Sequence, residues 1–231
     1  MKFKFLKVAI SGLLLSTVSL ANVVHAGLIT DGFTFSIASG LDQLSGNHFH
    51  SSTGGDYGNA SGKAEIGNFN SEEVRGLSEY DLNGQLAALS AFVTFDAFSY
   101  GLFDGTNDFP FNGTIDVISY QGNNQENISD YQAAASTIIG SFSTVGINAG
   151  DIFSFDILTA FNMAIANNWS SLGIRLQTED TGVNTGGAWV FDDFRLTTTD
   201  DTVTSVPEPS TLAIFALGMI GLASRRFKKQ S

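Results

Sequence analysis

The stretch Ile152-Phe153-Ser154-Phe155-Asp156-Ile157 places apolar side chains at 153, 155 and 157, with Ser154 and Asp156 between them. Such a period of two is typical of a strand that buries one face, because successive side chains point to opposite sides. The same spacing or a short apolar run recurs along the chain, in Phe33–Ile37, Phe92–Phe95, Thr114–Tyr120, Leu172–Leu176 and Val190–Leu196. The chain therefore reads as a succession of short strands.

Turn signals separate these strands: Asn83-Gly84, Asp104-Gly105, Asn112-Gly113 and Gly186-Gly187. Together with 20 Phe and 25 Gly, this pattern predicts an all-β fold, a single β-sandwich or jelly roll. One segment differs. In Thr159–Asn167, Phe161 and Ile165 lie one helical turn apart and Thr159 can cap the N-terminus, so we expect one short helix there.

The first 26 residues predict a signal peptide. Lys2, Lys4 and Lys7 precede the apolar run Val8–Leu20, and Val24-His25-Ala26 offers small residues at the −3 and −1 positions of a cleavage site. We expect cleavage after Ala26 and export through the inner membrane.

Residues 206–231 combine three features in a fixed order. Pro207-Glu208-Pro209 comes first, the apolar run Thr211–Ala223 follows, and Ser224–Lys229 carries four cations, Arg225 and Arg226 among them. As a helix, 13 residues span about 20 Å, less than the roughly 30 Å of a hydrocarbon core. The cations would stay on the cytoplasmic side and leave the prolines outside. A short membrane helix of this kind is marginal as a permanent anchor.

This order resembles the PEP-CTERM sorting signal of bacterial proteins. The resemblance implies that an exosortase recognises Pro207, Glu208 and Pro209 together with the basic residues Arg225 and Arg226. It also implies an inner-membrane intermediate that becomes a cell-surface or extracellular-matrix protein, with the exosortase and the export machinery as partners. We expect the signal to be removed or remodelled after export.

Between these segments we expect a β-sandwich domain over 27–196 and a linker over 197–205. This part holds only Lys63, Arg75, Arg175 and Arg195 against 22 carboxylates, a net charge of −18, more acidic than the −12 of the whole chain. Such a charge disfavours nucleic acid and anionic lipid as partners. The chain has no cysteine, which excludes disulfides and thiolate chemistry.

A second resemblance covers the middle of the chain. It rests on Val74–Leu82, Ser90–Phe95, Ile115–Val117 with Tyr120, Ser154–Phe161 and Ser171–Leu176. Their order is similar to the jelly-roll modules of the disaggregatase-related (DNRLRE) group, found on bacterial surface proteins and carbohydrate-active enzymes. Tyr80 stands where the modules have Phe, and one extra residue precedes Thr159. The resemblance implies a jelly roll and selects no ligand.

Two acidic segments are candidate calcium ligands. One holds Asp104 and Asp108, and the other is Asp192-Asp193. Alternation in Val190–Leu196 would put Asp192 on an apolar face, where an unpaired carboxylate is costly. Calcium, a nearby arginine or backbone N–H groups would have to compensate, so calcium and a hydrogen-bonded aspartate both remain open.

Trp169 and Trp189 are candidates for stacking on sugar rings, with core packing as the alternative for both. His48 and His50 would face one side of a strand and could share a metal, or they could lie in a solvated loop. No nucleophile elbow accompanies them, and adjacent acids such as Glu72-Glu73 do not by themselves indicate a catalytic pair.

We therefore predict a non-catalytic surface or exopolysaccharide-matrix protein that binds polysaccharide or acts in adhesion, without a cofactor other than calcium. The alternative is an extracellular polysaccharide-active enzyme, a glycoside hydrolase or lyase, which would require a cleft with convergent carboxylates.

Overall fold

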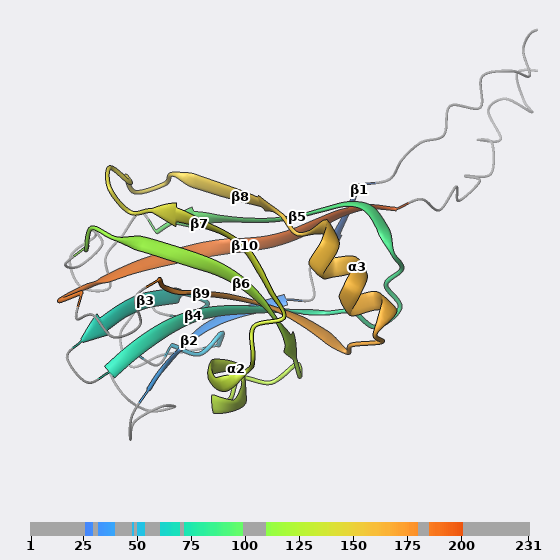
Figure 1. Ribbon diagram of the computed structural model, residues 1–231, viewed down its shortest axis with the longest axis horizontal. Coiled ribbons are helices and arrows are strands. Elements are labelled where there is room, and N and C mark those ends of the chain that lie inside the picture. Colours follow the sequence, from blue (N-terminus) through green and yellow to red (C-terminus); the bar gives the residue numbers. More distant parts are fainter. Residues whose placement is uncertain are drawn as a thin grey trace, which may run out of the picture. The chain divides into compact units, whose positions relative to one another are not determined.

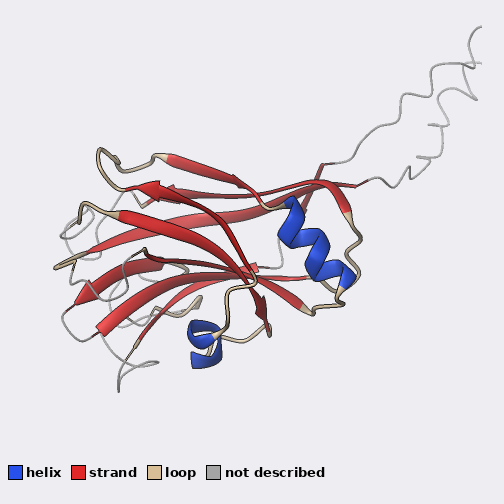
Figure 2. Cartoon of the chain, viewed as in Figure 1, coloured by secondary structure: helices blue, strands red, loops and turns tan. Residues whose placement is uncertain are grey.

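The computed structural model describes residues 26–29, 32–39, 48, 50–53, 61–69, 72–98, 110–179 and 185–200. The sorting segment, the N-terminal segment before Ala26, and the predicted calcium ligands Asp104 and Asp108 lie outside these ranges. The described elements are ten strands and two helices (Figures 1 and 2): β1 Ala26–Ile29, β2 Gly32–Ala38, β3 Ala64–Phe69, β4 Glu72–Asp81, β5 Ala88–Ala97, β6 Thr114–Gly122, α2 Ile128–Gln132, β7 Thr137–Ser143, β8 Ile152–Asp156, α3 Leu158–Ala166, β9 Ser171–Thr178 and β10 Ala188–Asp200. The all-β prediction is confirmed.

The strands form two antiparallel layers joined at one corner. Their order is β7-β6-β9-β4-β3-β10-β5-β8, with β1 beside β10 and β2 beside β4. One edge of β4 pairs with β2 over 74–80, and on the other edge the start of the strand, 72–74, pairs with β3 and the remainder, 76–81, pairs with β9. The β3–β4 hairpin therefore carries the path from the β4 layer to the β10 layer. At the opposite side the terminal strands β7 and β8 approach each other (Figure 1), and the Phe142 and Phe153 ring centroids lie 4.5 Å apart.

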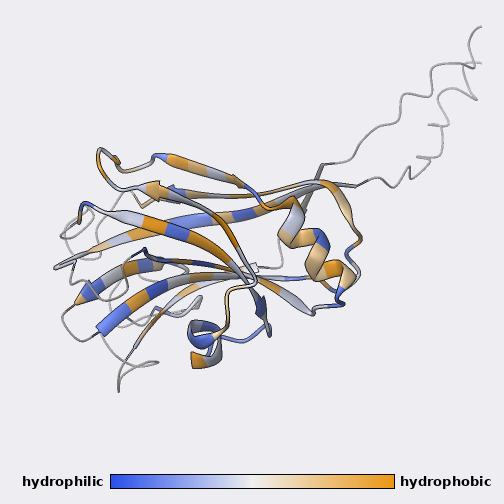
Figure 3. Ribbon diagram, in the orientation of Figure 1, coloured by the Kyte–Doolittle hydropathy of each residue, from blue (hydrophilic) through white to orange (hydrophobic). Residues whose placement is uncertain are grey.

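The core lies between the layers, and Figure 3 shows how hydrophobic and hydrophilic residues alternate along the strands that enclose it. On β5 the buried side chains are Ala91, Val93 and Phe95, while Ser90, Phe92 and Thr94 point away. Phenylalanines from four strands fill the centre of the core near β7 and β8: Phe95, Phe142, Phe153, Phe155, Phe191 and Phe194. The alternation that predicted the strands is thus the pattern that builds the core.

Strand β10 departs from regular alternation, and this corrects one expectation. Its pairing with β5 shifts register between Asp192 and Arg195, and Asp193 has a left-handed φ of 52°. A β-bulge of this kind adds one residue on one strand. Phe191, Phe194 and Leu196 therefore all contribute to the core, whereas Asp192 points away from it. The expectation that Asp192 shares an apolar face with Phe194 is wrong.

The predicted helix is present as α3, one residue earlier at each end than Thr159–Asn167. Its cap differs, because the N-cap position is Ile157 and the Asp156 carboxylate accepts from the Leu158 N–H at 2.9 Å. A second helix, α2, was not expected. It begins with a capping box in which Asn127 is the N-cap and Asp130 reaches back to the Asn127 N–H. Strand β10 continues to Asp200, so the first four residues of the predicted linker are strand.

A second, smaller core lies on the outer face of the β4 layer, under α2. It contains Phe35, Ile37, Leu77 and Tyr120. The Tyr120 ring occupies the space above Gly173, its cross-strand neighbour on β9. A Cβ at Gly173 would come within 2.1 Å of the Tyr120 Cζ atom. Only glycine is compatible with a ring at that position.

We therefore expect Gly173→Ala to lower the free energy of unfolding by about 2 kcal/mol or more. The added methyl group would clash with the Tyr120 ring, which is fully buried and has no free space to move into. Urea denaturation measures the change. Gly140→Ala on β7 is the matched control, since its Cβ would lie 3.3 Å from the Phe155 ring and should cost less. Equal destabilisation by the two variants would contradict the close packing of Tyr120.

Candidate functional site

Glu79 on β4 is the most deeply buried carboxylate among the described residues, with no solvent exposure. It accepts four hydrogen bonds. The Tyr120 hydroxyl donates at 3.0 Å, the Ser171 hydroxyl at 2.9 Å, and the N–H groups of Asn123 and Asn124 at 3.1 and 2.8 Å. A carboxylate with this many donors is satisfied inside the protein. It joins three strands and the loop that leads into α2.

Asp130 in α2 is a second buried carboxyl close to Glu79, at 1% exposure. Burial raises its pKa to about 7, and the negative charge of Glu79 contributes to the shift. A buried carboxyl with a displaced pKa, such as that of Asp130, is a feature of acid–base sites. Here neither group reaches solvent, so the pair is structural and cannot meet a substrate.

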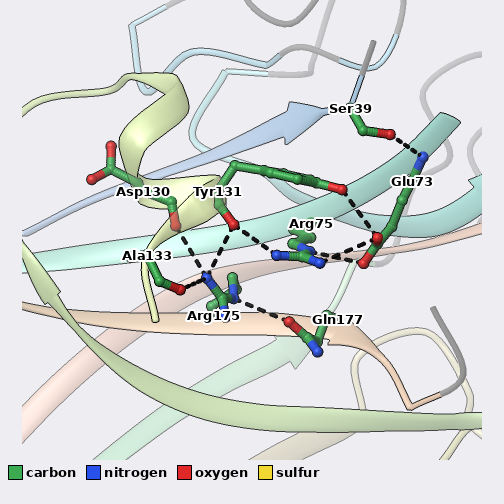
Figure 4. A network of polar contacts seen from close by, with 8 residues as sticks. All are labelled: Ser39, Glu73, Arg75, Asp130, Tyr131, Ala133, Arg175 and Gln177. Carbon is green, nitrogen blue, oxygen red and sulfur yellow. Dashed lines mark hydrogen bonds and ion pairs between the residues drawn. The ribbon is translucent and has the colours of Figure 1, made fainter. Parts of the chain in front are cut away.

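Two arginines fasten α2 to the outer face of the β4 layer (Figure 4). Arg175 is almost fully buried, and its Nη1 donates to three carbonyls at the end of α2: those of Asp130, Tyr131 and Ala133. Cations at this end of a helix oppose its partial negative charge. Burial, together with the neighbouring Arg75, lowers the pKa of Arg175 to about 10.

Arg75 completes this arrangement. Its guanidinium lies 4.1 Å from the centroid of the Tyr131 ring and forms a two-atom ion pair with Glu73. Glu73 also accepts from the Tyr131 hydroxyl at 3.0 Å. Both arginines are thus used in holding α2, and neither is available to an anionic ligand.

His48 and His50 meet at one carboxylate, Glu65 on β3. The His48 Nδ1 lies 2.8 Å from one Glu65 oxygen, and the His50 Nε2 lies 2.6 Å from the other. The expectation that the two histidines face one side is confirmed. The alternative of a solvated loop is wrong at His50, which is fully buried. The His48 ring also stacks on Phe69 at 4.3 Å. These contacts hold His48 and His50 against β3.

Of the predicted calcium ligands, Asp192 and Asp193 lie in the described part of the chain, and each forms an ion pair with a cationic side chain. Asp192 forms an ion pair with Lys63, at 2.7 Å, and the Lys63 ammonium also lies over the Phe98 ring. Asp193 pairs with Arg195 at 2.9 Å. Within the described part of the chain, no group of three His, Asp or Glu side chains is arranged to hold a metal ion. The burial of Asp192 is therefore compensated by a lysine.

The two tryptophans lie in or against the core. Trp189 is buried, shares the inner face of β10 with Phe191, and donates its indole N–H to the Phe111 carbonyl at 2.8 Å. Its ring faces are thus not open to a ligand. Trp169 follows α3 and is half-buried against the same core. Of the two, only Trp169 keeps part of its surface exposed.

A different surface combines an exposed aromatic ring with hydroxyls. It is the outer face of the β8-β5-β10 sheet, and we call it the hydroxyl face: Ser90, Phe92, Thr94, Ser154, Thr197 and Thr199. Phe92 is 39% exposed and stands between Thr197 on β10 and Asp156 on β8. The Ser90 and Thr199 hydroxyls are hydrogen-bonded at 2.6 Å.

Sequence reasoning missed this surface because it assigned the phenylalanines to core packing and named only Trp169 and Trp189 as stacking candidates. The signal was nevertheless present. In Ser90–Phe95 the polar positions alternate with Ala91, Val93 and Phe95, so Phe92 falls on the polar side of the strand. Core packing does not explain a large aromatic side chain on the polar face of a strand, so its presence there indicates a surface role.

Comparison with known protein families matches residues 205–229 to the PEP-CTERM protein-sorting motif. No curated protein matches the chain. The PEP-CTERM resemblance is confirmed, and the chain is an exported protein that an exosortase sorts through the membrane toward the cell surface. The individual roles of Pro207, Glu208, Pro209, Arg225 and Arg226 stay predictions, and the DNRLRE resemblance is not confirmed.

Within the described ranges, no helix has the length and apolar character needed to span a membrane. The predicted short membrane helix, Thr211–Ala223, lies outside those ranges.

The His48–Glu65 contact gives a defined pH dependence. Burial alone would lower the pKa of His48, but the hydrogen bond and charge of Glu65, with the charge of Glu72, raise it above 6.5. Burial would raise the pKa of Glu65, yet the hydrogen bonds from both histidines lower it below 4.5. His48 therefore stabilises the fold fully below pH 6.5 and loses this effect as the pH rises through its folded pKa. Glu65 stabilises above pH 4.5 and loses its effect as the pH falls.

We expect the difference in unfolding free energy between wild type and His48→Gln to be largest between about pH 4.5 and 6.5 and to shrink toward pH 9. Urea denaturation at a series of pH values measures it. In a Glu65→Gln background the same substitution should lose most of this pH dependence, which makes the pair a double-mutant cycle. A difference that stays constant from pH 5.5 to 8.5 would contradict the charged contact.

Proposed function

We propose that the exported β-sandwich is a non-catalytic component of the cell surface or exopolysaccharide matrix that binds polysaccharide through the hydroxyl face. The observation that carries this proposal is Phe92. An exposed aromatic ring set among hydroxyls and flanked by Asp156 offers the stacking and hydrogen-bonding groups that sugar rings use. Because the Phe92 ring and the surrounding hydroxyls are carried by paired strands, they are held in fixed positions relative to one another.

The register spaces the face regularly. Thr197, Phe92 and Asp156 form one cross-strand row, and Arg195, Thr94 and Ser154 form the next. Neighbouring strands lie about 4.8 Å apart, so the rows present polar groups at intervals that suit a flat sugar chain. The net charge of −18 over residues 27–205 repels uronate or sulfate polymers, which favours a neutral polysaccharide.

A second candidate, a polysaccharide-active enzyme, has one observation in its favour. Asp96 on β5 and Asp192 on β10 are direct cross-strand neighbours. Burial raises the pKa of Asp96, with Asp193 and Asp192 adding to the rise against the opposing effect of Arg195. Glycoside hydrolysis uses a carboxylic acid with a raised pKa close to a second, ionised carboxylate. The Lys63 ion pair to Asp192 weighs against it, because the lysine occupies the second carboxylate.

We expect the exported protein to retain at least one neutral polysaccharide on a glycan array, and Phe92→Ala to weaken that binding about tenfold through lost ring contact. The matched control is Leu89→Ala, which removes an exposed apolar side chain from the same strand outside the face. Equal binding by Phe92→Ala and wild type would refute the proposed surface. New reducing ends that disappear in Asp96→Asn would instead support the enzyme.

A further inference from the structure

Strands β7 and β8 are the two ends of the strand order. In the described ladders, β7 pairs with β6 and β8 pairs with β5. Each is thus an edge strand, and the two meet through phenylalanine rings. The outer edge of such a strand presents backbone N–H and C=O groups that another strand can pair with.

The sequence of β7 lacks the usual protection of an edge. Thr137–Ser143 contains no charged residue and no proline, and it is rich in β-branched and aromatic side chains. Ile138 is 69% exposed. The β-bulge in the β6–β7 ladder, at Val117 and Ile118, is the one protective feature of this strand in the described structure.

The segment that contains β7 and β8 carries few charged residues, and the carboxylate beside β7 in the ladder is Asp116 on β6, opposite Ser141. Residues 131–174, which include β7, β8 and α3, contain two charged side chains, Asp151 and Asp156, out of 26 in residues 27–205. Both are used locally. Asp151 accepts from the Asn148 N–H at 2.7 Å, and Asp156 accepts from the Leu158 N–H at 2.9 Å.

Two copies repel one another, because each carries a net charge of −18 over residues 27–205. The repulsion is weakest where the contacting surfaces carry no charge and where the acidic surfaces lie more than a Debye length apart. Strand β7, which carries no charged side chain of its own, meets the first of these conditions for a second copy. A basic partner would instead be drawn to the acidic remainder of the surface. The uncharged edge therefore selects an identical chain over a charged partner.

We infer that the β7 edge pairs with the β7 edge of a second copy, about a two-fold axis, and so joins the β4 layers of two molecules into one continuous antiparallel sheet. Seven residues a side make a small interface, so the association is weak and depends on concentration. Each dimer would carry two hydroxyl faces, which gains avidity on a polymer without any new contact to it.

Sedimentation velocity tests this on the exported protein, recovered from cells that express the full chain, at about 10 µM to 1 mM, a range set by so small an interface. We expect a monomer–dimer equilibrium that shifts toward dimer as NaCl rises from 20 to 500 mM, because salt screens the repulsion. Ile138→Glu should weaken dimerisation at least about tenfold, and so should Ser141→Lys, which also changes an exposed position of β7. Leu86→Glu, at a side chain 58% exposed in the β4–β5 loop, is the control and should leave it unchanged.

Four results would overturn the inference. A monomer at about 1 mM, the upper end expected for an interface of this size, would show that the edge does not pair. Loss of the dimer in Ile152→Glu but not in Ile138→Glu would assign the contact to β8. Dissociation by EDTA would show a cation bridge, and dissociation by added salt would show an interface built on charge.

Discussion

The four hydrogen bonds accepted by Glu79 are the constraint on which the outer half of the structure depends. They tie β4 to Tyr120 on β6, to Ser171 on β9 and to the backbone that leads into α2. A buried carboxylate is stable only when its donors are all in place, so Glu79 requires the strand register around it. Gly173 and Gly122 follow from the same requirement, because a Cβ at either would meet Tyr120 or Glu79. α2 then closes the site, and Arg75 and Arg175 hold its end.

The buried ionisable groups that stabilise the fold therefore lie apart from the polar groups that are exposed on the surface. The displaced ionisable groups near Glu79 and the histidines at Glu65 are all engaged with protein atoms, and they stabilise segments that the strand ladders alone leave loose. The opposite layer presents its hydroxyl face without such a cover, and the bulge at Asp193 directs Asp192 toward Lys63 while it keeps Phe191 and Phe194 in the core. Sorting by the PEP-CTERM motif delivers this exposed sheet to the outside of the cell.

Sequence reasoning succeeded where the signal is local and periodic. Phe153 and Phe155 predicted a one-sided strand, Phe161 and Ile165 predicted α3, and the Pro-Glu-Pro order predicted the sorting motif. It failed where long-range contacts decide. The alternation rule misplaced Asp192, since a single left-handed residue at Asp193 reverses the faces that follow. The burial of Glu79 had no local mark, because its donors come from residues more than 40 positions away along the chain. The Asn127–Asp130 capping box of α2 was visible and was overlooked.

Amide hydrogen exchange at Asn123 and Asn124 measures the central constraint most directly. These two N–H groups lie in a short loop, outside any strand ladder, and both donate to the buried carboxylate of Glu79. If Glu79 organises the outer half of the fold, both amides exchange as slowly as those in the middle of β4 and β9, through opening of the whole unit. Exchange as fast as in the exposed turn at Asn83-Gly84 would show that the loop opens by itself, and that Glu79 is merely accommodated by a fold that other contacts determine.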